Sequence, residues 1–329
     1  MFRFAKTLVI VGVALLGALA SRAQAADPWP QRTIRLVVAF VPGGATDTMI
    51  RQVSNDLQEA FGVPVIVENR PGGNGYVAWN YVASSEPDGY TLLVAENALG
   101  MSQALYKKTR SSFDPLLQYE AIAGLANAPA VLLVANKIKV DNVSQLVALS
   151  KTVPQKLNFG SAGIGSVAHL IFEVFRDGAG IDAVHVPYKG GGQAINDIVG
   201  GQIEMLMAGV SVAKGLIEAD RVKALAVTGR DRSPALPKVP TLTEAGVKTV
   251  DVDLGFWFGL FGPKGLPAPV KAKIEQVVSG VMAKPQVRAR LAQLDIEPEY
   301  LPGPVLRAKL EREIVNWTRF LDDKGIKAD

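Results

Sequence analysis

The chain of 329 residues contains no cysteine and only two histidines, His169 and His185. The absence of cysteine excludes disulfides, thiolate metal sites and a cysteine nucleophile. Neither histidine belongs to a cluster of His, Asp and Glu at metal-ligand spacing, so we expect no metal. Neither stands beside an obvious serine nucleophile, and no G-x-S-x-G elbow occurs. The sequence therefore predicts neither a catalytic residue nor a cofactor.

The sequence also lacks a run of lysine and arginine that would indicate a nucleic-acid partner. Beyond the N-terminal segment it has no apolar stretch of the roughly 20 residues that a membrane-spanning helix needs. What it does have is 48% hydrophobic residues over a length that exceeds one ordinary core. We therefore expect two domains of ordinary size.

The N-terminus has the three parts of a secretory signal peptide. Residues 1–7 are basic, residues 8–20 are almost wholly apolar, and Ala23-Gln24-Ala25 is a small-x-small cleavage site. The apolar run is too short for a membrane anchor, which is the alternative interpretation. We predict a signal peptide over residues 1–25, a mature chain from Ala26 and export to the periplasm.

The first third alternates strands with helices. Residues 34–40, 65–67 and 91–94 are predicted strands, and residues 77–83 a helix. A second predicted helix, between the first two strands, has apolar residues at helical spacing from Met49 to Phe61 and stops at Gly62. Strands separated by helices favour a parallel sheet with helices on both faces, in an α/β fold.

The middle third also alternates strands with helices, although its sequence does not repeat that of the first third. Predicted strands cover residues 131–134, 157–159, 183–186, 204–208 and 222–227, and a helix with an apolar stripe from Val167 to Phe175 is expected to end at Gly178. The last third is mostly helix, over residues 270–282, 288–294 and 305–321. The aromatic stretch 251–260 is expected to carry the chain back. We therefore predict residues 26–125 and 251–329 in lobe 1, and 126–250 in lobe 2.

Two short glycine loops each lie between a predicted strand and a predicted helix. They are Pro42, Gly43, Gly44, Ala45, Thr46 and Asp47 in the first lobe, and Ser161, Ala162, Gly163, Ile164, Gly165 and Ser166 in the second. The first turn of a helix leaves backbone N–H groups unpaired and carries the positive end of the dipole. Glycine lets a ligand approach that backbone closely. We predict that the loops are two halves of an anion clamp.

Each loop also has a plainer interpretation. The first could be a tight turn in which Asp47 stabilises the helix dipole. In the second, residues 163–168 match the dinucleotide pattern G-x-G-x-x-A. The preceding strand is short, the pattern lies in mid-chain, and nicotinamide cofactors are not expected outside the cytoplasm. The glycine-rich loop over residues 69–75 is predicted to be structural.

Six segments resemble, in family order, the extracytoplasmic receptors of tripartite tricarboxylate transporters, also called the Bug family of periplasmic solute-binding proteins. They cover residues 42–47, 67–72, 87–93, 161–170, 186–202 and 239–246. The resemblance extends over essentially the whole mature chain. It implies a type II periplasmic-binding-protein fold with two α/β lobes, and a cleft that closes on a small organic carboxylate held by both glycine loops. It also implies delivery to the membrane components of such a transporter, and we expect a monomer.

Side chains near the loops are expected to set ligand selectivity. Phe40 precedes the first loop, Asn97 follows a strand end where α/β sheets bind ligands, and Tyr188 follows another strand. We add Asp197, which lies in one of the matching segments. Glu96, beside Asn97, could repel an anion or could pair with a cationic or amino group.

Three other polar residues have plainer expectations. Lys189 is either a solvated charge or a long-range attractor for anions. His169 falls opposite the apolar stripe of its helix, so we expect it to be solvated or locally bonded. His185 is expected to be a satisfied core histidine.

The sequence thus predicts a periplasmic solute receptor that binds a small organic carboxylate by lobe closure. Two alternatives stay open. One is a sensor that binds the same ligand but signals to a protein partner. The other is an exported α/β enzyme acting on carboxylates or phosphate esters, which the absence of a nucleophile–base pair disfavours.

Overall fold

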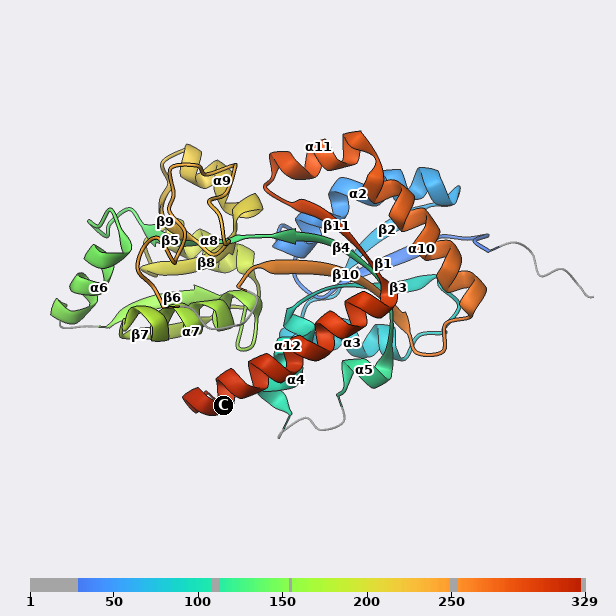
Figure 1. Cartoon of the computed structure of the whole chain (residues 1–329), viewed down its shortest axis with the longest axis horizontal. Helices are drawn as coiled ribbons and strands as arrows, with labels where there is room; N and C mark the ends of the chain where they lie inside the picture. Colours follow the sequence, from blue (N-terminus) through green and yellow to red (C-terminus); the bar gives the residue numbers. More distant parts are fainter. Residues whose placement is uncertain (1–28, 108–112, 154–155, 249–253, 327–329) are drawn as a thin grey trace, which may run out of the picture.

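The computed structural model describes residues 29–107, 113–153, 156–248 and 254–326. The predicted signal peptide lies outside the described residues. Two sheets, each flanked by helices, lie side by side along the long axis of the molecule (Figure 1). We call the two halves lobe 1 and lobe 2 after their sheets.

The sheet of lobe 1 has six described strands in the order β11-β4-β10-β3-β1-β2. Their bounds are β1 (Ile34–Val38), β2 (Val65–Asn69), β3 (Thr91–Glu96), β4 (Tyr119–Ala128), β10 (Phe256–Pro263) and β11 (Glu297–Pro302). β1 pairs in parallel with both β2 and β3, whereas β10 runs antiparallel to both β3 and β4. β11 is antiparallel to β4.

The sheet of lobe 2 has five described strands in the order β7-β6-β8-β5-β9. Their bounds are β5 (Ala130–Ala135), β6 (Leu157–Ser161), β7 (Ala183–Pro187), β8 (Met205–Gly209) and β9 (Val222–Val227). β6 is parallel to its neighbours β7 and β8, and β5 is antiparallel to β8 and β9. Both sheets are therefore mixed, which corrects the expected parallel sheet, because β10 and β11 run against the other strands of lobe 1 and β5 runs against those of lobe 2.

The helices divide between the lobes in the same way. Those of lobe 1 are α2 (Ala45–Phe61), the 3-10 turn η1 (Gly73–Gly75), α3 (Tyr76–Ala83), α4 (Ala98–Tyr106), α5 (Pro115–Gln118), α10 (Ala268–Ala283), α11 (Pro285–Gln293) and α12 (Gly303–Lys324). Those of lobe 2 are α6 (Val143–Thr152), α7 (Val167–Ala179), α8 (Gly191–Val199) and α9 (Val210–Glu218).

The amphipathic helices bury the faces that their sequences indicate. In α2 the apolar residues from Met49 to Phe61 are buried, and the helix ends at Gly62 in the left-handed conformation. In α7 the stripe from Val167 to Phe175 is buried as expected, but the helix ends at Gly180, not at the predicted Gly178.

Gly178 has a different role. A Cβ atom at this position would lie 1.9 Å from the carbonyl oxygen of Lys248. The absent side chain therefore permits a loop to cross the helix closely. Packing, and not helix termination, accounts for this glycine.

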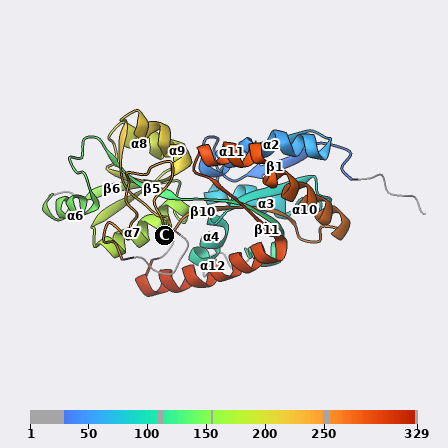
Figure 2. The same cartoon turned by 45° about the horizontal axis from the view of Figure 1, so that its top comes forward.

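The chain crosses between the lobes twice, and the helix α12 also connects them. β4 is followed by Pro129 and then by β5, so the chain passes from the first sheet to the second within one residue. β10 brings it back, as expected for the aromatic stretch, and packs between β3 and β4. The long helix α12 runs along lobe 1 toward lobe 2 (Figure 2), where Lys324 Nζ lies 2.9 Å from Asp177 Oδ2 of α7.

No helix in the described part of the chain is long and apolar enough to span a membrane. The apolar run of residues 8–20 lies outside that part.

Candidate functional site

A cavity of about 70 Å³ lies between the two lobes. On this measure one water needs about 10–15 Å³, so the cavity has room for several waters or one small solute. Lobe 1 contributes Phe40, Gly43, Gly44, Ala45, Thr46, Asp47, Glu96 and Phe256 to its wall. Lobe 2 contributes Ala162, Ser166, Val167, Ala168, Gly191, Ile195, Leu206, Met207, Ala208, Gly209 and Val212.

Four helices begin at the wall of this cavity. They are α2 after Gly44, α7 after Ser166, α8 after Gly190 and α9 after Gly209. No side chain caps α2, α8 or α9, and only α7 has a capping side chain, that of Ser166. Uncapped first turns present backbone N–H groups and the positive ends of their dipoles. The cavity is therefore suited to an anion.

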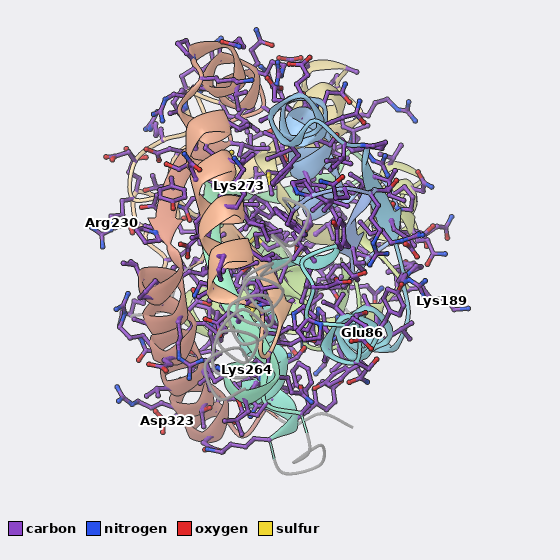
Figure 3. The ribbon with its side chains drawn as sticks, turned by 90° about the vertical axis from the view of Figure 1, so that its right-hand side faces the viewer. Glu86, Lys189, Arg230, Lys264, Lys273 and Asp323 are labelled. Carbon is purple, nitrogen blue, oxygen red and sulfur yellow. The ribbon has the colours of Figure 1, made fainter. Side chains whose placement is uncertain are left out.

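No lysine or arginine is among the described residues that line the cavity. In Figure 3 the labelled Lys189 and Arg230 side chains lie at opposite edges of the molecule and point outward. Lys189 is exposed, which fits the solvated charge of the two interpretations offered for it. An anion in this cavity would be held by backbone groups and not by an ion pair.

The first glycine loop is held by Asp47. Its carboxylate accepts hydrogen bonds from the Gly43 N–H at 3.0 Å and from Asn69 Nδ2 at 2.9 Å, and forms an ion pair with Arg51 at 2.9 Å. Burial opposes these partners, but together they lower the pKa of Asp47. Gly43 has φ +84°, where glycine is favoured. Asp47 therefore remains charged, and Arg51, one turn further along α2, balances its charge.

The second glycine loop is held by the two histidines. The Gly165 N–H donates to His169 Nδ1 at 3.1 Å, and Ser161 Oγ lies 2.7 Å from His185 Nε2. The two imidazole rings stack with their centroids 4.0 Å apart. Ser161 Oγ also accepts from the Gly163 N–H at 3.0 Å. The histidines thus fix the loop from behind and do not line the cavity.

This arrangement corrects two expectations. His169 is only 5% exposed, so the solvated alternative is wrong and the locally bonded one is right. His185 is half-buried and does stand beside a serine, because the parallel pairing of β6 with β7 brings Ser161 next to it. Ser161 is committed to hydrogen bonds within the loop.

Glu96 is the least expected residue in the wall. It ends β3, is 8% exposed, and accepts a short hydrogen bond from the Thr46 hydroxyl. No ion pair connects it to a described cationic side chain, in contrast to Asp47. Burial raises the pKa of Glu96 to about 7, against the opposing effect of the Thr46 hydrogen bond.

Eight predicted site residues line the cavity. They are Phe40, Gly43, Gly44, Ala45, Thr46, Asp47, Ala162 and Ser166. The other predicted residues are not in its wall: Pro42, Asn97, Ser161, Gly163, Ile164, Gly165, Tyr188 and Asp197. Asn97 is fully buried and donates to the Gly255 carbonyl at 2.9 Å. Tyr188 donates to Asp197 at 2.6 Å, and burial followed by that contact raises the pKa of Tyr188 to about 12.

Sequence reasoning missed the part of the cavity wall that β8 and Phe256 form. Residues 206–209 end β8 directly before α9 and line the cavity, but no glycine-rich pair marks that turn. The signal that could have found it is position, because ligands of α/β sheets bind where strands end and helices begin. No group of three or more His, Asp or Glu suited to a metal occurs among the residues described.

Two α/β lobes that enclose a small cavity lined by helix N-termini define a periplasmic-binding-protein fold. The family model of the tripartite tricarboxylate transporter family receptor matches residues 49–324, and the chain belongs to this family. It is a family of solute-binding receptors and not of enzymes. A relative from Pseudomonas sp. strain P51, encoded in the tcbD-tcbE intergenic region, is 33% identical over 98% of this chain and 95% of its own.

Solved structures of the family share the fold. The periplasmic binding protein BugD is 29% identical with a TM-score of 0.85, covering 92% of this chain and 100% of its own. MatC from Rhodopseudomonas palustris, solved with bound malate, is 31% identical with a TM-score of 0.82, covering 88% of this chain and 99% of its own. Another R. palustris protein, solved with adipate, is 29% identical with a TM-score of 0.86, covering 91% and 99%.

Proposed function

We propose that this chain captures a small organic carboxylate between its lobes and delivers it to the membrane components of a tripartite tricarboxylate transporter. The observation that carries the proposal is the convergence of four helix N-termini from both lobes on one cavity, with no lysine or arginine among the described residues that line it. Similar proteins solved with malate and adipate support a carboxylate as the ligand class.

The proposed mechanism is closure of the lobes around the solute. α2 of lobe 1 would hold one side of the ligand, and α7, α8 and α9 of lobe 2 would complete the site. Contacts made to both lobes exist only in the closed state, so the ligand stabilises that state. For this mechanism we keep the division at residues 26–125 and 251–329 against 126–250, and a monomer exported by a cleaved signal peptide.

A thermal-shift screen tests the ligand class. The probes are malate, succinate, adipate and benzoate, with succinamide as an uncharged control. A ligand at 100 times its dissociation constant stabilises the native state by about 2.7 kcal/mol, which raises the melting temperature by roughly 4 °C in a protein of this size. We expect at least one carboxylate to produce such a shift and succinamide to produce none.

If no carboxylate shifts the melting temperature, or if succinamide is as effective as succinate, the proposal is wrong. Delivery is tested separately, by pull-down of the transporter's membrane components with the ligand-saturated receptor.

A further inference from the structure

The two acidic side chains that line the cavity are in opposite electrostatic situations. Asp47 has Arg51, Asn69 and a backbone N–H as partners. Glu96 has the neutral hydroxyl of Thr46 and no ion-pair partner among the described residues. A buried ionised carboxylate without a cation is costly, so it either takes up a proton or obtains its cation from outside.

A solute with a cationic group would supply that cation. Glu96 lies at the carboxyl end of β3, and its contact with Thr46 places it at the first turn of α2. The N-termini of α7, α8 and α9 face the cavity from lobe 2. A solute in the cavity therefore meets a carboxyl group on one side and the positive ends of helix dipoles on others.

We propose that the solute is a small amino carboxylate, whose ammonium group pairs with the Glu96 carboxylate while its own carboxylate faces the helix N-termini. This inference rests on the proposed function as a carboxylate receptor. A plain dicarboxylate would leave the charge of Glu96 unmatched and would add a second negative charge beside it. The cavity volume of about 70 Å³ favours a compact molecule.

Matched ligand pairs test the inference by calorimetry at pH 7.5. Aspartate differs from succinate, and 2-aminoadipate from adipate, by one ammonium group. We expect the wild-type protein to bind the better amino member at least about tenfold more tightly than its plain partner. In Glu96→Gln this ratio should fall to about one or below, because the neutral amide keeps the shape and removes the charge.

Glu313→Gln is the matched control. Glu313 is also a buried carboxyl, 6% exposed, but it accepts from Trp257 Nε1 at 2.7 Å and does not line the cavity. Its replacement should leave the ratio unchanged. Circular dichroism and melting temperature confirm that both variants are folded.

Proton exchange gives a second readout. Asp47, which is paired with Arg51, is the other titratable residue of the cavity wall, and the paired β10 residue Phe258 carries no charge. An ammonium ligand favours ionised Glu96, so its binding near pH 7 should release protons, whereas a plain dicarboxylate should take them up. Calorimetry in buffers of different ionisation enthalpy measures the sign.

The possible failures are distinguishable. Two results would overturn the role of Glu96 and leave the carboxylate receptor standing. One is tight binding of plain dicarboxylates with an amino-to-plain affinity ratio that Glu96→Gln does not change. The other is proton uptake with every ligand. If neither member of either pair binds, and the wider carboxylate screen also fails, the proposed function itself is wrong and this inference fails with it.

Discussion

At the scale of single residues, the structure separates side chains that face the solute from side chains that hold the loops. Asp47, His169 and His185 form the hydrogen bonds that shape the two glycine loops. Glu96 is the buried acid that these bonds do not neutralise. A ligand recognised by backbone N–H groups depends on such supporting residues, because they fix where the donors point.

The histidine pair predicts a dependence of stability on pH. Burial is the main cause that lowers the pKa of His169 to about 3 and that of His185 to about 4, with repulsion from Arg176 and, for His169, from His185. Glu173 Oε1 lies 3.6 Å from His169 Nε2, and Glu173 is itself paired with Arg176. We expect the contribution of these neutral histidines to the free energy of unfolding to be fully present above about pH 6.5, the pKa of histidine in the unfolded chain. It should decline as the pH falls below that value.

The measurement is the free energy of unfolding by urea at pH 7.5, 6 and 5, for the wild type and for His169→Asn. Asparagine places an acceptor oxygen near the position of Nδ1 and does not titrate. Below pH 6.5 the free energy of unfolding should fall with pH less steeply in the variant than in the wild type. We expect the two slopes to differ by up to about 1.4 kcal/mol per pH unit. Equal slopes for both proteins would show that His169 is not held neutral.

At the scale of elements, the helix N-termini are the units that make the site. Gly44 directly precedes α2 and has φ −75°, and a Cβ there would meet only the Val41 carbonyl oxygen, at 3.6 Å. A Cβ on Gly191, at the start of α8, would meet nothing within 4 Å. Both positions line the cavity, so side chains can be added on either lobe without backbone strain.

We expect Gly44→Val and Gly191→Val each to fold and to weaken carboxylate binding at least about tenfold, which is about 1.4 kcal/mol. The physical reason is that a branched side chain blocks access to the backbone donors of α2 or α8. Calorimetry with the best ligand of the thermal-shift screen is the measurement. Gly280→Val, in α10 with open space around it, is the control.

Unchanged affinity in one folded variant would remove that helix from the site. The second glycine loop is less suited to this test. Gly163 has φ +122°, so a valine there would strain the backbone and confuse folding with binding.

The elements that sequence reasoning found share a strong pattern. The stripes of α2 and α7, the buried strand β1 and the β10 segment all have dense apolar spacing, and the structure has each of them. β4 was missed although it joins the lobes, because its sequence over residues 119–128 is rich in alanine and glycine, which have little strand propensity. Its partners β10 and β11 supply the order that its own residues do not.

Only the parts of the candidate site that have a local sequence pattern could be predicted. Glycine next to a helix start marked the α2 and α7 ends of the cavity, because that pattern is local. The contribution of residues 206–209 depends on which strands become neighbours, and the sequence does not show that order. The burial of Glu96 depends on the packing of β3 against β10 and α2. The sequence therefore shows the charge of Glu96 but not that it lacks an ion-pair partner.

At the scale of the whole molecule, the lobes touch beside the cavity. Asn74 of lobe 1 has φ +54°, and its side chain is so close to lobe 2 that a Cβ on Gly165 would lie 3.0 Å from its Nδ2 atom. Tyr106 Oη lies 3.5 Å from the Ile164 carbonyl oxygen. The first contact joins the loop predicted to be structural to the second glycine loop, and the second joins α4 to that same loop.

Closure must draw its free energy from contacts that exist only when the lobes meet. Asn74→Gly keeps the left-handed backbone and removes one such side chain outside the cavity wall. We expect all ligands to bind weaker by a similar factor, on the order of 3–10-fold, because the closed population falls by that factor. The ratio between amino and plain carboxylates should stay constant, in contrast to Glu96→Gln.

Small-angle scattering with and without ligand measures the closure itself. The wild type should become more compact on saturation, and Asn74→Gly should reach the same compactness only at a higher ligand concentration. Asp220→Gly provides the matched control, since Asp220 also has a left-handed backbone, at φ +51°, but is exposed after α9 and away from the cavity. A wild type that binds tightly without compaction would mean that the lobes are already closed before the ligand arrives, and the closure mechanism would then be wrong.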